Sequence, residues 1–129
     1  MWIRFLNRFF LAIMAILWMS SQAAAESLKP FVLGDTPPGD LKQVADAVKL
    51  KVTAAGFEIV GSYSPFANAI VICVTNNDLK TTAASVPNGG FGAVQRISVT
   101  DVKGKIQVAY VNPVYLGTAY GMGSPRLPM

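Results

Sequence analysis

The first 25 residues have the three-part pattern of a secretory signal peptide, which limits how much of the chain is left to fold. Arg4 and Arg8 form a basic segment, and an uninterrupted apolar run of 11 residues follows from 9 to 19. This run is much shorter than the ~20 residues that a membrane-spanning helix needs. Small residues then end at Ala25, a suitable site for cleavage before Glu26. A cleaved signal is therefore favoured over an uncleaved signal anchor.

Cleavage there would leave 129 − 25 = 104 residues, which is the length of a single domain. We expect residues 1–25 to be the signal peptide, 26–120 to form one α+β domain, and 121–129 to be a flexible C-terminal tail. Export through the signal peptide predicts a periplasmic or secreted protein, with no stable membrane insertion after cleavage.

The charge of the chain does not favour nucleic acid as a partner. Eleven basic and seven acidic residues give a net charge of +4, and loss of Arg4 and Arg8 with the signal reduces it to +2. The remaining basic residues are scattered and form no stripe. We therefore expect no nucleic-acid partner.

The cysteine and histidine counts restrict the available chemistry. A single cysteine, Cys73, cannot form an internal disulfide. It lies in the apolar stretch 70–74, where a thiol usually packs as a small buried hydrophobe, with a reactive thiol as the alternative. The chain has no histidine, which most catalytic zinc sites and most Ser-His or Cys-His nucleophile systems require. We predict no catalytic residue, no metal site and no cofactor.

Periodicity gives the order of secondary structure. Apolar residues at helical spacing predict a helix over 41–55, with Asp40 as its N-cap and Gly56 as its stop. Lys103-Gly104 is typical of a tight hairpin turn. The other expected elements are strands at 29–33, 57–63, 69–75, 91–102 and 105–111, a turn at 64–68, and short helices at 79–85 and 114–120. The order β-α-β-β-α-β-β-α predicts a two-layer α+β sandwich, a mostly antiparallel sheet with helices on one face.

The densest glycine cluster, 89–92, allows two interpretations. It can be a loop whose backbone N–H groups approach an anion or a partner, or a helix-to-strand connection that needs positive φ. It lacks the Lys-Ser/Thr of a phosphate loop and does not lead into a helix, so a nucleotide site is not indicated.

One group of side chains is a candidate ligand site. Arg96 is the only basic residue inside a predicted strand rather than at its first position, and it can hold an anion or pair with Asp101 or Glu58. Aromatic and amide side chains near the end of the last strand can line a small pocket beside the glycine turn. The candidate ligand-binding residues are Phe91, Arg96, Tyr110 and Asn112.

Several stretches carry a resemblance to a known family. They are Gly56-Phe-Glu-Ile-Val-Gly-Ser-Tyr63, Val71-Ile-Cys-Val-Thr-Asn76, Gly90-Phe-Gly-Ala93, Arg96-Ile-Ser-Val99 and Gln107-Val-Ala-Tyr-Val-Asn-Pro113. Over about 41–120 the chain resembles the domain-of-unknown-function family DUF302. The resemblance implies a small α+β fold with helices on one side of a sheet, and short exported bacterial proteins with no established reaction. Members usually carry an early histidine and a longer last helix, and this chain departs from both.

These observations favour an exported, non-catalytic domain that binds a small ligand or a partner protein of the cell envelope. Two alternatives stay open. One is an enzyme or redox accessory protein that uses Arg96, Cys73 or the tyrosines, and the other is a structural part of an envelope complex.

We predict that signal peptidase cleaves after Ala25, because Ala23 and Ala25 fit its preference for small residues. N-terminal sequencing of the exported protein should begin at Glu26. A protein that keeps Met1 and fractionates with membranes would contradict both the cleavage and the assignment of 1–25.

Overall fold

The elements follow each other along the chain in the order that the sequence predicts. The computed structural model describes residues 28–123, so the predicted signal peptide and residues 124–129 of the predicted tail lie outside the described part. The elements are β1 (Phe31–Asp35), α2 (Leu41–Ala54), β2 (Glu58–Phe66), β3 (Ala69–Thr75), α3 (Asn77–Ala84), the 3-10 turn η1 (Gly89–Gly92), β4 (Gln95–Val102), β5 (Lys105–Val111) and α4 (Pro113–Ala119).

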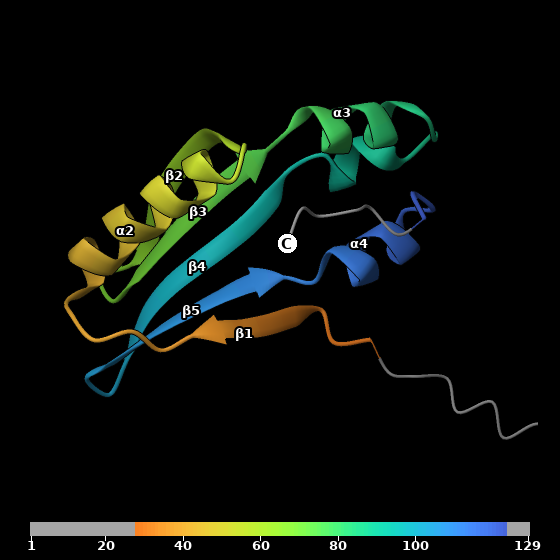
Figure 1. Cartoon of the computed structure of the whole chain (residues 1–129). Coiled ribbons are helices and arrows are strands. Elements are labelled where there is room, and N and C mark those ends of the chain that lie inside the picture. Colours follow the sequence, from red (N-terminus) through yellow and green to blue (C-terminus); the bar gives the residue numbers. More distant parts are fainter. Residues whose placement is uncertain (1–27, 124–129) are drawn as a thin grey trace, which may run out of the picture.

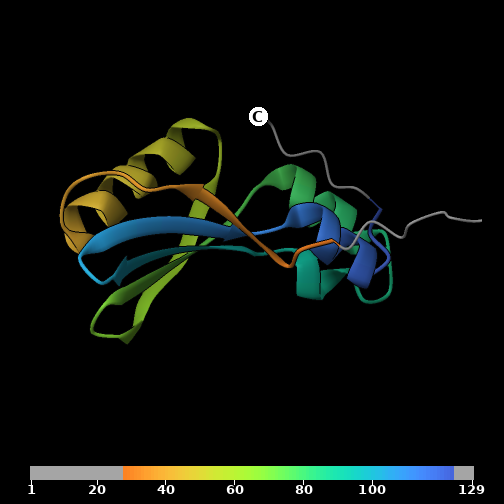
Figure 2. The same ribbon diagram turned by 90° about the horizontal axis from the view of Figure 1, so that it is seen from below.

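The five strands form one open antiparallel sheet in the order β1-β5-β4-β3-β2 (Figure 1). β2–β3 and β4–β5 are hairpins, and β1 joins β5 with Phe31 opposite Val111. α2 lies over one face of the sheet, whereas α3, η1 and α4 gather beyond the end of the strands (Figure 2). The predicted α+β class with an antiparallel sheet is confirmed. Only α2, however, covers the face of the sheet itself.

The sequence of α2 explains both its ends and its inner side. Asp40 is the N-cap, and its side chain accepts a hydrogen bond from the backbone N–H of Gln43 at 2.9 Å. Gly56 follows the helix with φ +87°, a conformation that glycine adopts without strain. The predicted helix, 41–55, therefore agrees with the observed one to within a residue.

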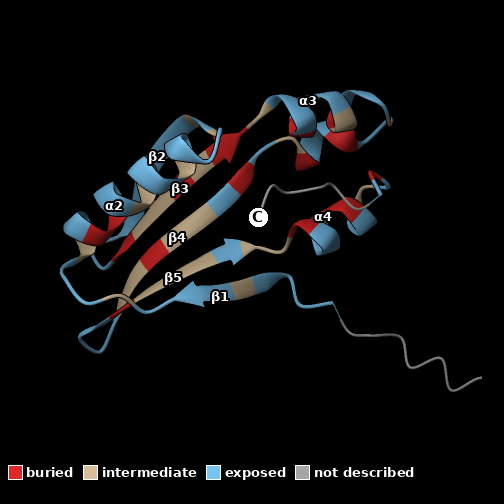
Figure 3. Ribbon diagram, in the orientation of Figure 1, coloured by how far each residue is buried: buried red, intermediate tan, exposed pale blue. Residues whose placement is uncertain are grey.

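The core lies between α2 and the middle of the sheet. Ile72 of β3 and Val99 of β4 are fully buried, and Val44 and Ala45 of α2 pack against them. Figure 3 shows buried segments along β3 and β4, while β1 and β5 are mostly half-buried or exposed. The apolar face of α2 therefore packs against one part of the sheet and leaves the rest uncovered.

Alternation along β4 separates two faces of different character. Ile97 and Val99 belong to the core under α2, so Arg96 and Ser98, which alternate with them, point to the opposite face. Cys73 is paired with Arg96 across β3 and β4 and is half-buried on that opposite face. The expectation that Cys73 packs as a buried hydrophobe was therefore wrong, because no helix of the described chain covers this face.

The two hairpins differ in how well the sequence predicts them. Lys103 and Gly104 both have positive φ, 54° and 80°, and the Gly104 N–H donates to the Asp101 side chain, which confirms the predicted tight turn. In the other hairpin, β2 continues to Phe66 although 64–68 was predicted to be a turn. The pairing of β2 with β3 shifts register between Tyr63 and Phe66, so the strand extends through an irregular region.

The glycines of η1 are required by packing rather than by positive φ. All the described glycines with positive φ lie outside 89–92. This contradicts the interpretation that the glycines at 89–92 are needed for positive φ. A Cβ at Gly89 would instead overlap the carbonyl oxygen of Ala83 in α3, and one at Gly92 would overlap the sulfur of Met122. Met122 is itself buried, so η1 connects α3 to the segment that follows α4.

This packing predicts different effects for two neighbouring substitutions. Gly89→Ala should lower the free energy of unfolding by about 1–3 kcal/mol, because the new methyl group meets backbone that must shift. Gly90→Ala is the matched control, since its new methyl group would have no neighbouring atom within 4 Å, and it should change stability by less than ~1 kcal/mol. Urea unfolding of both variants measures the difference. Equal destabilisation would show that η1 does not pack as described.

Candidate functional site

A groove opens on the face of the sheet that α2 covers incompletely. α2 contacts β2, β3 and β4, which leaves space above β5 and beside β1. The groove has a volume of about 480 Å³. We call it the α2 groove. Its floor is formed by side chains of β4 and β5, one wall by α2, and the other by the end of β1 and the connection to α2.

The lining of the α2 groove is predominantly apolar. Ile97, Val108 and Tyr110 form the floor, and Val44, Ala47, Val48 and Val52 line the helix wall. Pro37 and Pro38 contribute to the facing wall. The polar or charged lining residues besides Tyr110 are Asp35, Gln43 and Lys51, all of them exposed. This combination of apolar walls and a few polar groups is typical of a small-molecule site.

A smaller hollow of about 90 Å³ adjoins one end of the groove. The two share Val52, Ile97 and Tyr110, and the hollow extends to Phe57, Val74, Gln95 and Val111. We call it the inner hollow. Because Asp35 is paired with Val108, whereas Tyr110 borders the inner hollow, the acidic residue of the groove lies at the opposite end.

Gln95 is the unusual residue of the inner hollow. Its side chain is only 6% exposed, and its Nε2 donates to the carbonyl of Gly92 at 3.3 Å. Its Oε1 is buried without a hydrogen-bond partner among the described residues. Exchanging the two amide atoms would place oxygen against the Gly92 carbonyl, so the present orientation is the favourable one. A buried acceptor thus stays unsatisfied, which is uncommon in folded proteins.

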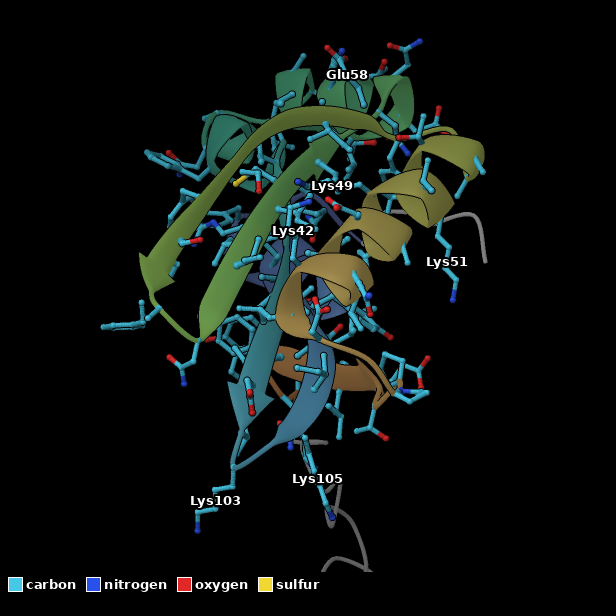
Figure 4. All side chains as sticks on the ribbon, turned by 90° about the vertical axis from the view of Figure 1, so that its left-hand side faces the viewer. Lys42, Lys49, Lys51, Glu58, Lys103 and Lys105 are labelled. Carbon is cyan, nitrogen blue, oxygen red and sulfur yellow. The ribbon has the colours of Figure 1, made fainter. Side chains whose placement is uncertain are left out.

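The lysines of α2 differ in the partners that they have. Lys42 and Lys49 contact Asp46, at 2.7 and 3.7 Å. The hydrogen bond with Lys42, together with the charge attraction, lowers the pKa of Asp46 and raises that of Lys42. Figure 4 shows Lys51 extending from the helix on the side away from Lys42 and Lys49. Lys51 lines the groove and forms no ion pair with any residue in 28–123.

The four residues predicted as a ligand site do not gather in one place. Tyr110 lines the α2 groove, while Arg96 lies on the opposite face of the sheet and forms no ion pair within the described chain. Phe91 is exposed and stacks on Tyr120 with ring centroids 5.6 Å apart. Asn112 caps α4 and donates to the Lys29 carbonyl at 2.9 Å. Ligand binding by these residues stays a prediction, now divided among separate surfaces.

The partners suggested for Arg96 are also engaged elsewhere. Glu58 forms an ion pair with Lys80 at 2.8 Å, and Asp101 accepts the hydrogen bond of the hairpin turn. The opposite face of the sheet carries Arg96 together with the exposed apolar side chains of Phe31, Leu33 and Tyr63. We call this surface the open face.

The sequence analysis did not predict the α2 groove or the burial of Gln95. Val44, Val48 and Val52 have the periodicity of a core-facing helix, and nothing in that pattern shows that the helix covers three strands out of five. Gln95 lies within the predicted strand 91–102, where it looks like an ordinary polar residue. Its place on the core-facing side of β4 becomes informative only when its burial is known.

The part of the chain that the structure describes has neither a cluster of metal-ligating side chains nor a helix suited to crossing a membrane. Within 28–123, no three cysteine, aspartate or glutamate side chains gather closely enough to hold a metal ion. None of the helices in the same range combines the length and apolar character needed to cross a membrane.

Comparison with known proteins supports the fold. No protein-family model matches the sequence, and no curated protein sequence matches it significantly. The structure is similar to the crystal structure of an uncharacterized conserved protein, DUF302, from Bacillus stearothermophilus, with a TM-score of 0.64 and 12% sequence identity. The alignment covers 73% of this chain and 82% of that one. The DUF302-like fold expected from the sequence motifs is therefore confirmed.

Proposed function

We propose that this chain is a small exported domain that binds a small molecule with an apolar body in the α2 groove. The observation that carries the proposal is the groove itself. Its volume of about 480 Å³ lies within the range of known small-molecule sites, roughly 300–1,000 Å³. Export is proposed from the signal-peptide pattern of residues 1–25.

Binding without catalysis fits the residues that line the groove. The titratable ones are Asp35, Lys51 and Tyr110, which come from three different elements. Asp35 accepts a hydrogen bond from the Thr36 backbone N–H at 2.8 Å, so this carboxylate already has a structural partner. Nucleophilic catalysis usually needs a nucleophile and a base within hydrogen-bond reach of each other, and no such pair is among these residues.

The open face supports a second candidate function, the binding of a partner protein in the cell envelope. Phe31 and Leu33 of the edge strand β1 are 62% and 58% exposed. Tyr63 of β2, which forms the other edge of the sheet, is 54% exposed on the same face. Exposed apolar residues that share one surface are typical of protein contacts. This candidate concerns a different surface from the groove, so the two can be tested separately.

The groove predicts that an added large side chain blocks binding. Dodecanoate is a suitable probe, since it combines an apolar chain with one charged group. Ala47→Trp should weaken its binding by about tenfold or more, because Ala47 lines the groove and the indole would occupy it. Isothermal titration of the exported protein measures the affinity.

The matched control is Ala54→Trp, an exposed alanine of the same helix that does not line the groove. This variant should bind dodecanoate like the wild type. Circular dichroism should show that both variants keep the fold. If Ala47→Trp binds as tightly as Ala54→Trp, or if the wild type does not bind the probe, the groove is not the site.

A further inference from the structure

The sequence of β3 is typical of a strand that is covered on both of its faces. An antiparallel strand with one face in water normally alternates between apolar and polar residues. In β3 the residues that face α2 are Ile70, Ile72 and Val74, and the alternating residues Val71 and Cys73 are apolar as well. The described chain covers the first set with α2 and leaves the second set without a helix above it (Figure 2). The open face therefore has the composition of a surface that packs against something.

One row of side chains crosses the open face from edge to edge. Leu33 is opposite Ala109, Ala109 is opposite Ser98, and Val71 lies between Ser98 and Tyr63 in the same ladder. We call these five residues the neutral row. All five are uncharged, and only Ser98 and Tyr63 carry a polar side-chain atom. A second surface can therefore pack against this row without burying a charge.

The positions on either side of the neutral row are complementary to each other. Arg96 lies two residues before Ser98, is exposed, and forms no ion pair with the residues in 28–123. Thr100 lies two residues after Ser98 and is opposite Gln107 of β5. The hydroxyl and amide oxygens of these two residues can accept hydrogen bonds from a guanidinium group. The open face thus has donors on one side of the neutral row and acceptors on the other.

The open face is also large enough for a stable dimer. Its three middle strands are seven or eight residues long. At about 3.3 Å per residue and about 4.8 Å between strands, the five-stranded face measures roughly 550 Å². Two such faces in contact would remove more than about 1,000 Å² from water, which is the minimum expected of a biological interface.

We infer that the open face binds a second copy of this chain, sheet against sheet, about a twofold axis that runs along the neutral row. A twofold interface uses the same surface twice, so that surface has to be complementary to itself. Rotation about this axis places the neutral row of one copy on that of the other. It also brings Arg96 of each copy over Thr100 and Gln107 of the other, and it separates the two Arg96 residues by roughly 13 Å along the strands. The inference concerns the face opposite the α2 groove and does not depend on ligand binding there.

A charge in the middle of the neutral row should separate the two copies. Ser98→Arg would place two guanidinium groups against each other at the axis, so the dissociation constant of the dimer should rise about tenfold or more. Sedimentation equilibrium of the exported protein over a range of concentrations measures this constant. Leu50→Arg is the matched control, because Leu50 is a 74% exposed apolar residue of α2 that does not line the groove. This variant should dimerise like the wild type.

Cys73 reports whether the open face is covered. It is the only cysteine of the chain, and it lies on this face opposite Arg96. Labelling of Cys73 by a thiol reagent should therefore slow several-fold as the protein concentration rises through the dissociation constant. In Ser98→Arg the rate should stay at the fast value of the monomer over the same concentrations. Circular dichroism should show that the variants keep the fold.

Each contrary outcome overturns the inference. A wild type that stays monomeric at high micromolar concentration forms no such dimer. Fast labelling of Cys73 in that monomer would favour a different partner protein, and slow labelling would indicate a cover supplied by residues outside 28–123. A dimer that Ser98→Arg leaves intact, or one in which labelling does not depend on concentration, would use another surface.

Two further controls keep the test decisive. Should Ser98→Arg fail to fold, Tyr63→Arg takes its place, and the concentration dependence of Cys73 labelling in the wild type still decides. Ser98→Arg should bind dodecanoate like the wild type, because the groove lies on the other face of the sheet. Failure of the dimer would therefore leave the proposed groove function standing.

Discussion

The architecture depends on one constraint, namely that a single helix has to cover a sheet wider than itself. α2 has 14 residues and a diameter of about 10 Å, whereas five strands spaced by about 4.8 Å extend over roughly 19 Å. The helix therefore packs over β2, β3 and β4, where Ile72 and Val99 are fully buried. The uncovered floor above β5 becomes the groove. The same shortage of helices leaves the other face of the sheet open.

Local chemistry made much of the fold predictable. Asp40 and Gly56 bound α2, Lys103 and Gly104 form the turn between β4 and β5, and Asn76 and Asn112 cap the helices that follow their strands. Each of these signals acts over a few residues, so it can be recognised without knowledge of the rest of the chain. The wrong predictions concern residues whose packing depends on segments that are far away in the chain. Gly89 and Gly92 are required by Ala83 and Met122, which no local pattern indicates.

The site was less predictable than the fold for a related reason. Arg96 drew attention because it is charged, but the neighbouring Gln95 carries the unsatisfied atom, and the two side chains lie on opposite faces of β4. Alternation correctly separated these two sets of residues. It could not show which set faces a helix and which lies exposed. That depends on where α2 packs, and its placement is a property of the whole sheet.

The pairing of β1 with β5 has a consequence for how the protein acquires its site. Phe31 and Val111 are opposite each other although 80 residues separate them in the chain. Such a contact carries a large loop-closure entropy and slows folding, while the β4–β5 hairpin needs only a tight turn. The wall formed by Pro37 and Pro38 follows β1 directly, so it reaches its position only when β1 docks. Chains in which β1 has not docked thus lack one side of the groove, and they should bind its ligand less tightly.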